Sequence, residues 1–149
     1  MTDGPPKTFA INRDNYHAEH VGHTGDGRQF FLTTPFEPAT REQAGSEYLA
    51  LFLFNGEGTL LEAKIDDFGP RATMVRGARA ALRKQRLREL GDVTFDRIEI
   101  APFSVERFNT TFGLIARPPD QFCQTWWVEL HPGNCMAFHE PWDSGEYDT

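Results

Sequence analysis

The chain has 149 residues, a size typical of one domain, and 39% of its residues are apolar, among them 13 Phe and 3 Trp. Its charged fraction of 25% argues against wholesale disorder, and no run approaches the ~18 apolar residues that a membrane-spanning helix needs. The net charge of −7 disfavours nucleic acid, so the sequence predicts a single globular domain over residues 1–149 that binds neither nucleic acid nor membrane.

The first fifteen residues are polar and contain Gly4-Pro5-Pro6, which predicts a loose N-terminal arm over residues 1–15. They lack the basic segment followed by an apolar segment that marks a secretory signal peptide, so we expect a cytoplasmic protein. Cys123 and Cys135 are the only cysteines, and a reducing cytosol predicts that both are free, buried thiols.

Strand patterns dominate the N-terminal half. Tyr16–His23 and Arg28–Phe36 read as two short strands that flank a glycine-rich turn. Tyr48–Phe54 is apolar on both faces, which predicts a central strand that is covered on both sides. Asn55-Gly56 is a strong hairpin signal because both residue types tolerate positive φ. The strand expected to return from this turn is Thr59–Phe68, in which apolar and polar residues alternate.

The segment 71–90 is the one convincing helix, and Gly91 provides a stop signal for it. Residues at helical spacing predict the side that packs on a sheet: Met74, Val75, Ala78, Ala81 and Leu82. Further strand-like runs follow, the last two joined by a turn over His131–Asn134. We therefore expect an α+β fold, an antiparallel meander of about six to eight strands with one helix packed on one face.

The helix also carries most of the positive charge. Between Arg71 and Leu90 there are seven basic residues and one acidic residue, a local charge of +6, whereas the rest of the chain carries −13. Four arginines spaced three and four residues apart define one stripe: Arg76, Arg79, Arg83 and Arg86. The stripe predicts a surface for an acidic partner or for phosphates. The alternative is an ordinary solvated helix face, partly neutralised by acidic loops.

The C-terminal run holds three Trp, two His and, in its last ten residues, four acidic side chains. Strand alternation places Trp126 with Val128 on one face and Trp127 with Glu129 on the other, so one of these tryptophans is expected in the core. An exposed Trp beside acidic loops is a suitable anchor for a protein partner. Trp127 and Trp142 are therefore candidate partner-binding residues.

The stretch HAEHVGH raises the question of a metal site. A metal-dependent hydrolase would use His17, Glu19, His20 and His23 with Asp26, and His131 or His139 would complete the ligand set. A strand, however, turns His17 and Glu19 to one face and His20 to the other, and nearby glycines disfavour a helix. We interpret the stretch as a strand edge and expect no metal and no cofactor. Asp66-Asp67, a pair that Mg²⁺ sites also use, is interpreted as solvated carboxylates at a strand end.

From about His20 onward, the chain resembles a group of small bacterial proteins labelled formate hydrogenlyase regulatory protein. The resemblance is carried by GDGRQFF, YLALFLFNGEGTLLEAKIDDFG, ARAALRKQRLREL, IEIAPFSV, FGLIAR and the ending WWVELHPGNCMAFHEPWDSGEYDT. It implies a small bacterial cytosolic protein with no known enzyme activity, and it assigns no catalytic or binding residue.

Nucleophile motifs are missing as well, because no serine stands in a GxSxG elbow and neither cysteine has a recognisable partner motif. The sequence therefore favours a non-enzymatic regulatory or protein-interaction module with an unknown protein partner. Two alternatives stay open: the metal-dependent hydrolase described above, and an immunity-type protein whose acidic surface neutralises a basic toxin.

Overall fold

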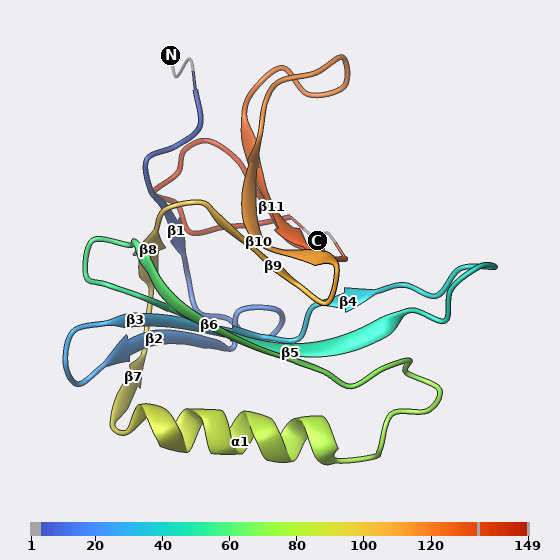
Figure 1. The fold of residues 1–149 in the computed structure, drawn as a ribbon. Coiled ribbons are helices and arrows are strands. Elements are labelled where there is room, and N and C mark those ends of the chain that lie inside the picture. Colours follow the sequence, from blue (N-terminus) through green and yellow to red (C-terminus); the bar gives the residue numbers. More distant parts are fainter. Residues whose placement is uncertain (1–3, 134, 149) are drawn as a thin grey trace.

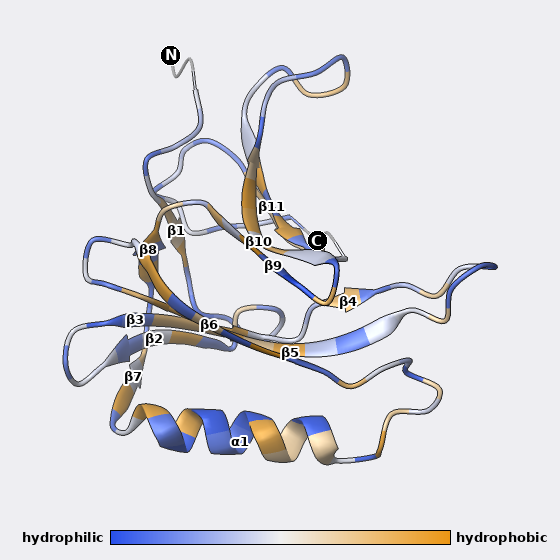
Figure 2. Ribbon diagram, in the orientation of Figure 1, coloured by the Kyte–Doolittle hydropathy of each residue, from blue (hydrophilic) through white to orange (hydrophobic). Residues whose placement is uncertain are grey.

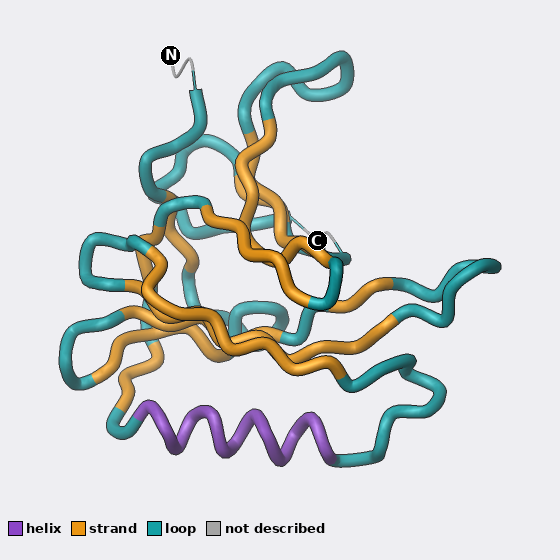
Figure 3. Tube along the Cα trace, viewed as in Figure 1, coloured by secondary structure: helices purple, strands orange, loops and turns teal. Residues whose placement is uncertain are grey.

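The structure, a computed structural model, describes residues 4–133 and 135–148. Within these residues the chain forms twelve strands and one helix, arranged in three antiparallel sheets (Figures 1 and 3), which confirms the α+β fold. The strands are shorter and more numerous than the six to eight that we expected. In chain order the elements are β1 (Phe9–Ile11), β2 (His20–Thr24), β3 (Gln29–Thr33), β4 (Phe36–Glu37), β5 (Ser46–Phe54), β6 (Leu60–Asp67), α1 (Ala78–Leu90), β7 (Val93–Phe95), β8 (Ile98–Ile100), β9 (Phe103–Arg107), β10 (Thr110–Arg117), β11 (Trp127–His131) and β12 (Ala137–Phe138).

The largest sheet is built around β5. One edge of β5 pairs with β6, and its other edge pairs with β4 and then β3; β2 and β7 extend the sheet beyond β3. β3 and β4 are two parts of the strand predicted over Arg28–Phe36. They are separated around Pro35, which has no N–H to donate to a neighbouring strand.

The central strand is buried on both faces, as the sequence predicted. No residue from Tyr48 to Phe54 is more than 3% exposed. The even-numbered residues face the larger core, and the odd-numbered leucines face a smaller core together with Phe30 and Leu32. Each face must therefore be covered by another layer, because a bare apolar face would be exposed to water.

The helix covers the smaller core. Leu82, Leu87 and Leu90 pack against the leucines of β5, and α1 runs beneath the sheet in Figure 1. The helix begins at Ala78 rather than at residue 71, because Gly77 directly before it has φ +82, a left-handed conformation that suits glycine. The predicted stop at Gly91 is confirmed, with its N–H donating to the carbonyl of Arg88. Figure 2 shows hydrophilic and hydrophobic residues alternating along α1.

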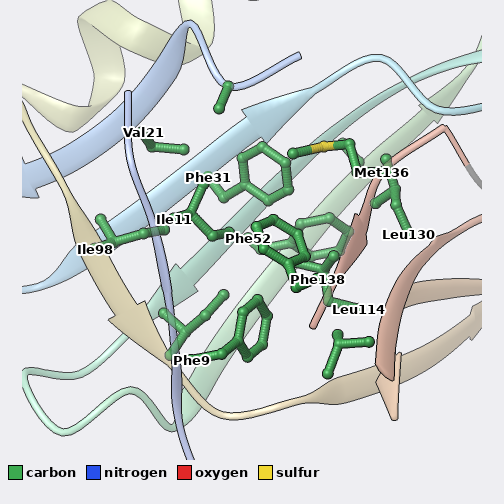
Figure 4. Close-up of a cluster of buried hydrophobic side chains, with 14 of the residues drawn as sticks. Phe9, Ile11, Val21, Phe31, Phe52, Ile98, Leu114, Leu130, Met136 and Phe138 are labelled. Carbon is green, nitrogen blue, oxygen red and sulfur yellow. The ribbon is translucent and has the colours of Figure 1, made fainter. Parts of the chain in front are cut away.

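The larger core lies on the opposite face of the main sheet. A four-stranded sheet in the order β12-β11-β10-β9 and the two-stranded sheet β1-β8 close it. Figure 4 shows side chains from all three sheets converging there, among them Phe31 and Phe52 of the main sheet and Leu114 and Phe138 of the second. Aromatic rings fill much of this core, with Phe9 and Phe138 at a ring-centre distance of 5.0 Å.

The expectation of a loose arm over residues 1–15 is wrong for its second half. Phe9–Ile11 form β1, whose residues pair with Ile98–Ile100 and are at most 2% exposed. The side chains of Phe9 and Ile11 belong to the larger core, and Ala10 donates its N–H to the carbonyl of Trp142 at 2.7 Å. Residues 1–3 lie outside the described residues.

Among the described residues, no helix combines the length and the apolar character that crossing a membrane requires.

The turn predicted over His131–Asn134 includes Asn134, which lies outside the described residues. Within this turn, Gly133 has φ +95.

The hairpin between β5 and β6 is confirmed. The position that requires a glycine in it, however, is Gly58 and not Gly56. Asn55 accepts the N–H groups of Glu57 and Thr59 on its side-chain oxygen, both at 2.9 Å, and Gly58 takes the left-handed conformation at φ +90. A Cβ at Gly58 would lie 2.8 Å from the carbonyl oxygen of Glu99. At Gly56 the nearest atom would be 3.6 Å away.

We therefore expect Gly58→Ala to lower the free energy of unfolding by about 2 kcal/mol or more, because it adds both backbone strain and a backbone clash. Gly56→Ala is the matched control and should change stability by less than about 0.5 kcal/mol. Urea denaturation of the two variants measures the difference. Equal losses would show that the hairpin conformation is assigned wrongly.

Candidate functional site

A groove of about 720 Å³ lies between the segment that follows β1 and the residues from β12 onward. Its walls are Asn12–Tyr16 on one side and Ala137–Asp148 on the other. Four carboxylates line it, and no lysine or arginine does. The lining carboxylates are Asp14, Glu140, Glu146 and Asp148, and we call this cavity the acidic groove.

Hydrogen bonds join the two walls of the acidic groove and order the C-terminal wall. Asn12 donates its N–H to the carbonyl of Gly145 at 3.1 Å and its side-chain amide to the carbonyl of Ser144 at 2.8 Å. Ala137 and Asp148 exchange two backbone hydrogen bonds of 2.9 Å. The groove is thus a preformed part of the fold, and binding in it requires little ordering of the chain.

A hydrogen bond between Tyr147 and Asp14 crosses from one wall to the other. The Tyr147 hydroxyl donates to the Asp14 carboxylate and accepts the N–H of His17 at 3.1 Å, while Tyr16 and Ala18 donate their N–H groups to the same carboxylate at 2.8 and 3.1 Å. Burial and the hydrogen bond to Asp14 raise the pKa of Tyr147 to about 12.

The charge of Asp14 is stabilised in this network. Burial acts to raise its pKa, but the hydrogen bonds from Tyr147 and from the backbone outweigh that effect and bring the pKa below its ordinary value. Asp14 is therefore ionised at neutral pH. His139 is the one basic side chain in the lining, and its Nε2 lies 3.6 Å from a carboxylate oxygen of Asp148. The groove thus attracts cations.

Ser144, His139 and Asp148 all line the acidic groove and are the residue types of a hydrolytic triad. A working triad needs a hydrogen bond of about 2.6–3.2 Å between nucleophile and base. Among the described residues the structure shows no such bond between Ser144 and His139, and the Ser144 hydroxyl instead accepts the N–H of Glu146 at 3.2 Å.

The arginine stripe does not form the exposed surface that we expected. Arg79 and Arg86 turn toward the sheet, where their side chains are 24% and 17% exposed. Arg79 lies 3.7 Å from the buried carboxylate of Glu47, and Arg86 lies 2.9 Å from Asp66.

The remaining arginines of the stripe are placed differently. Arg76 precedes the helix and is exposed, and Arg83 lines a second, much smaller cavity. The predicted apolar side is wrong as well. Met74 and Val75 precede the helix and Ala81 is exposed, so that Leu82 is the one predicted apolar residue that packs on the smaller core.

The candidate tryptophans are both partly buried. Trp127 and Glu129 share the outer face of β11, as predicted, and the indole N–H of Trp127 donates to Glu129 at 2.7 Å. Trp142 packs against the larger core, and its sequence neighbour Pro141 lines the acidic groove. Trp126 is also partly buried.

The three histidines of the HAEHVGH stretch do not form a metal-ligand group, although His17 and His20 line the same small cavity. His17 packs on the ring of Tyr16 at 4.0 Å, His20 on Phe95 at 5.8 Å, and Nε2 of His23 lies 2.8 Å from the carbonyl oxygen of Arg97. Over residues 4–133 and 135–148, no three His, Cys, Asp or Glu side chains are grouped to hold a metal ion. The hypothetical ligand set of His17, Glu19, His20 and His23 is therefore not assembled in this structure.

The other residues considered as ligands have separate roles. Asp26 accepts hydrogen bonds from Thr24 and Arg28, and His131 lies 2.6 Å from Glu129. Asp66 pairs with Arg86, whereas Asp67 accepts the N–H of Gly69 at 2.8 Å, so that the Asp66-Asp67 pair diverges. Cys123 and Cys135 are free thiols, and both are partly buried.

The acidic groove was not predicted from the sequence. Its two walls are more than 120 residues apart along the chain, and no local pattern indicates that they meet. The one available signal was the group of four acidic residues in the last ten, three of which line the groove.

The ion pairs between the helix and the main sheet can be tested by substitution. Arg86→Gln leaves Asp66 without its partner in a half-buried position, and we expect a loss of about 1–3 kcal/mol in the free energy of unfolding. Arg76→Gln removes the same charge from an exposed position and should change stability by less than about 0.5 kcal/mol. Thermal and urea unfolding of both variants give the comparison. A negligible loss in Arg86→Gln would mean that the pair does not form in solution.

The bond between Tyr147 and Asp14 leads to a second test. In Asp14→Asn the pKa of Tyr147 should fall from about 12 toward its ordinary value of 10.0, because the neighbouring negative charge is lost while burial remains. Since the pKa of Asp14 is lowered in the fold, its stabilising effect is present above its ordinary pKa of 3.8 and is lost as the pH falls below it. The stability difference between parent and variant should therefore shrink in acid. Spectroscopic titration of the tyrosines and acid unfolding measure the two effects, and an unchanged Tyr147 titration would contradict the assignment.

Comparison with known proteins does not extend this description. No family model, no curated protein and no solved structure matches the chain. The resemblance to the formate hydrogenlyase regulatory proteins stays a prediction, and the function has to be argued from the geometry of the groove.

Proposed function

We propose that the chain is a cytosolic, non-enzymatic protein-interaction module whose acidic groove receives a basic segment of a partner protein. The observation that carries the proposal is the composition of a preformed groove: four carboxylates and no lysine or arginine. A regulatory role would be exercised through that partner.

The size of the groove is consistent with this role. Ligand sites commonly enclose about 300–1,000 Å³, and 720 Å³ accommodates one or two long side chains of a peptide. The ring of Tyr16 is 69% exposed at the edge of the groove and offers a face to a guanidinium or ammonium group. Such a cation–π contact contributes about 0.5–1 kcal/mol at an exposed site.

Charge sets the expected strength and salt dependence. Exposed ion pairs contribute about 0–1 kcal/mol each, so four carboxylates alone support only weak binding. Their summed field also accelerates the encounter with a basic partner and weakens as salt is added. Nucleic acid would be repelled from the same surface, so the expected partner is a protein.

Neutralisation of a basic toxin is the second candidate, and the same groove favours it, since an inhibitor of this kind would cover a cationic surface. The two roles differ in what happens to the partner. A toxin would lose its activity on binding, whereas a regulated partner would keep or change it.

The proposal can be tested with a labelled arginine-rich peptide as probe, followed by fluorescence anisotropy. The double variant Glu140→Gln/Glu146→Gln should bind the peptide about tenfold more weakly at low salt, because two of the four charges are removed. The control Glu42→Gln/Glu62→Gln removes two exposed charges outside the groove and should reduce affinity less than about twofold. Equal losses of affinity in both variants would mean that the peptide responds to the net charge of the protein and does not bind in the groove.

A further inference from the structure

A second cavity of about 70 Å³ lies between the Tyr16–His20 segment, the end of β3 and the helix. Its lining is mainly polar and includes His17, His20, Thr34 and Arg83. At this volume the cavity is far below the ~300 Å³ of sites for organic ligands, yet larger than one water molecule needs. It therefore has the size for a small ion.

Arg83 differs from its neighbours on the helix. Arg79 and Arg86 each face a carboxylate, at 3.7 and 2.9 Å. Among the residues that the structure describes, no carboxylate oxygen lies within 4.0 Å of the Arg83 side chain, although that side chain is partly buried. A partly buried guanidinium with free donors is suited to an anion, and its fork matches two oxygens of a phosphate or carboxylate.

A second arginine lies close to this cavity. Arg13 lies nearby, with its guanidinium over Phe95, and its side chain donates to the carbonyl oxygen of Glu19. Burial lowers the pKa of His20; Glu19 acts to raise it, and Arg83 and Arg13 lower it further.

On the other side of the cavity, burial lowers the pKa of His17, while Asp14, whose carboxylate is held by Tyr147, acts to raise it. Glu19 is thus the one carboxylate in the lining, against Arg83 and two histidines. Arg83 is the one permanently charged hydrogen-bond donor in the lining.

We propose that this cavity binds a phosphate-type oxyanion, with Arg83 as its charged anchor and His20 and Thr34 as further contacts. Arginine supplies paired N–H donors, threonine a hydroxyl donor, and histidine an N–H whose protonation an anion favours. The ligand is either free inorganic phosphate or the phosphoryl group of a small phosphomonoester, since both present the same oxygens. The cavity adjoins the acidic groove at Tyr16, which lines both, but its other lining residues are different.

Titration with inorganic phosphate tests the proposal. Phosphate replaces sodium chloride during the titration, so that the ionic strength stays constant. The NMR signals of His20 and Thr34 report binding. The parent should show saturable shifts and a rise in the pKa of His20 on binding. Arg83→Gln should weaken binding by about tenfold or more. Arg88→Gln removes an equal charge from an exposed position of the same helix and should change affinity less than about twofold.

Thr34→Val provides a second, nearly isosteric variant in case Arg83→Gln disturbs the fold, and it should also weaken binding measurably. Glycerol phosphate is titrated in parallel. Tighter binding of glycerol phosphate assigns the site to a phosphomonoester, and tighter binding of inorganic phosphate assigns it to the free anion. Shifts that do not saturate with either probe, or equal losses in Arg83→Gln and Arg88→Gln, would overturn the proposal.

Discussion

Burial of β5 on both faces is the constraint from which the rest of the architecture follows. Seven consecutive residues, Tyr48 to Phe54, are withdrawn from water, so one layer must cover each face of the sheet. The helix covers one face with three leucines, and β1 and the second sheet cover the other. The residue before this run, Glu47, is only 4% exposed, and a buried carboxylate requires positive partners. Arg71 and Arg79 supply them, so the start of the helix is tied to the strand that it covers.

Local patterns were sufficient to predict this centre of the fold. The two-sided apolar run, the hairpin after it and the glycine stop of the helix each depend on neighbouring residues in the sequence. Predictions failed where the partner is distant. Phe9–Ile11 become a core strand only because Ile98–Ile100 lie beside them. The direction of Arg79 and Arg86 depends on carboxylates of β5 and β6, and helical spacing alone does not show which stripe faces a sheet that carries acidic residues.

The candidate sites were less predictable than the fold, for the same reason. A cluster in sequence, such as the histidines from His17 to His23, is spread over different partners once β2 forms. The acidic groove, by contrast, joins residues near Asp14 to residues near Glu146 that no pattern connects. The Asp14–Tyr147 hydrogen bond belongs to both the fold and the site. It joins the two walls of the groove and fixes the position of one of its charges.

The ion pairs of α1 have a consequence for how the helix is oriented. Leucine contacts are not directional, and a helix held by them alone can roll about its axis or slide along the sheet at modest cost. Arg79 and Arg86 are two turns apart and meet fixed carboxylates on β5 and β6, so only one roll and one axial position satisfy both. Replacing the two pairs by apolar residues would leave the total stability similar, because partly buried ion pairs often contribute little net free energy. In such a protein the helix would no longer have one unique orientation on the sheet. Arg83 would then lose its fixed position at the wall of the small cavity.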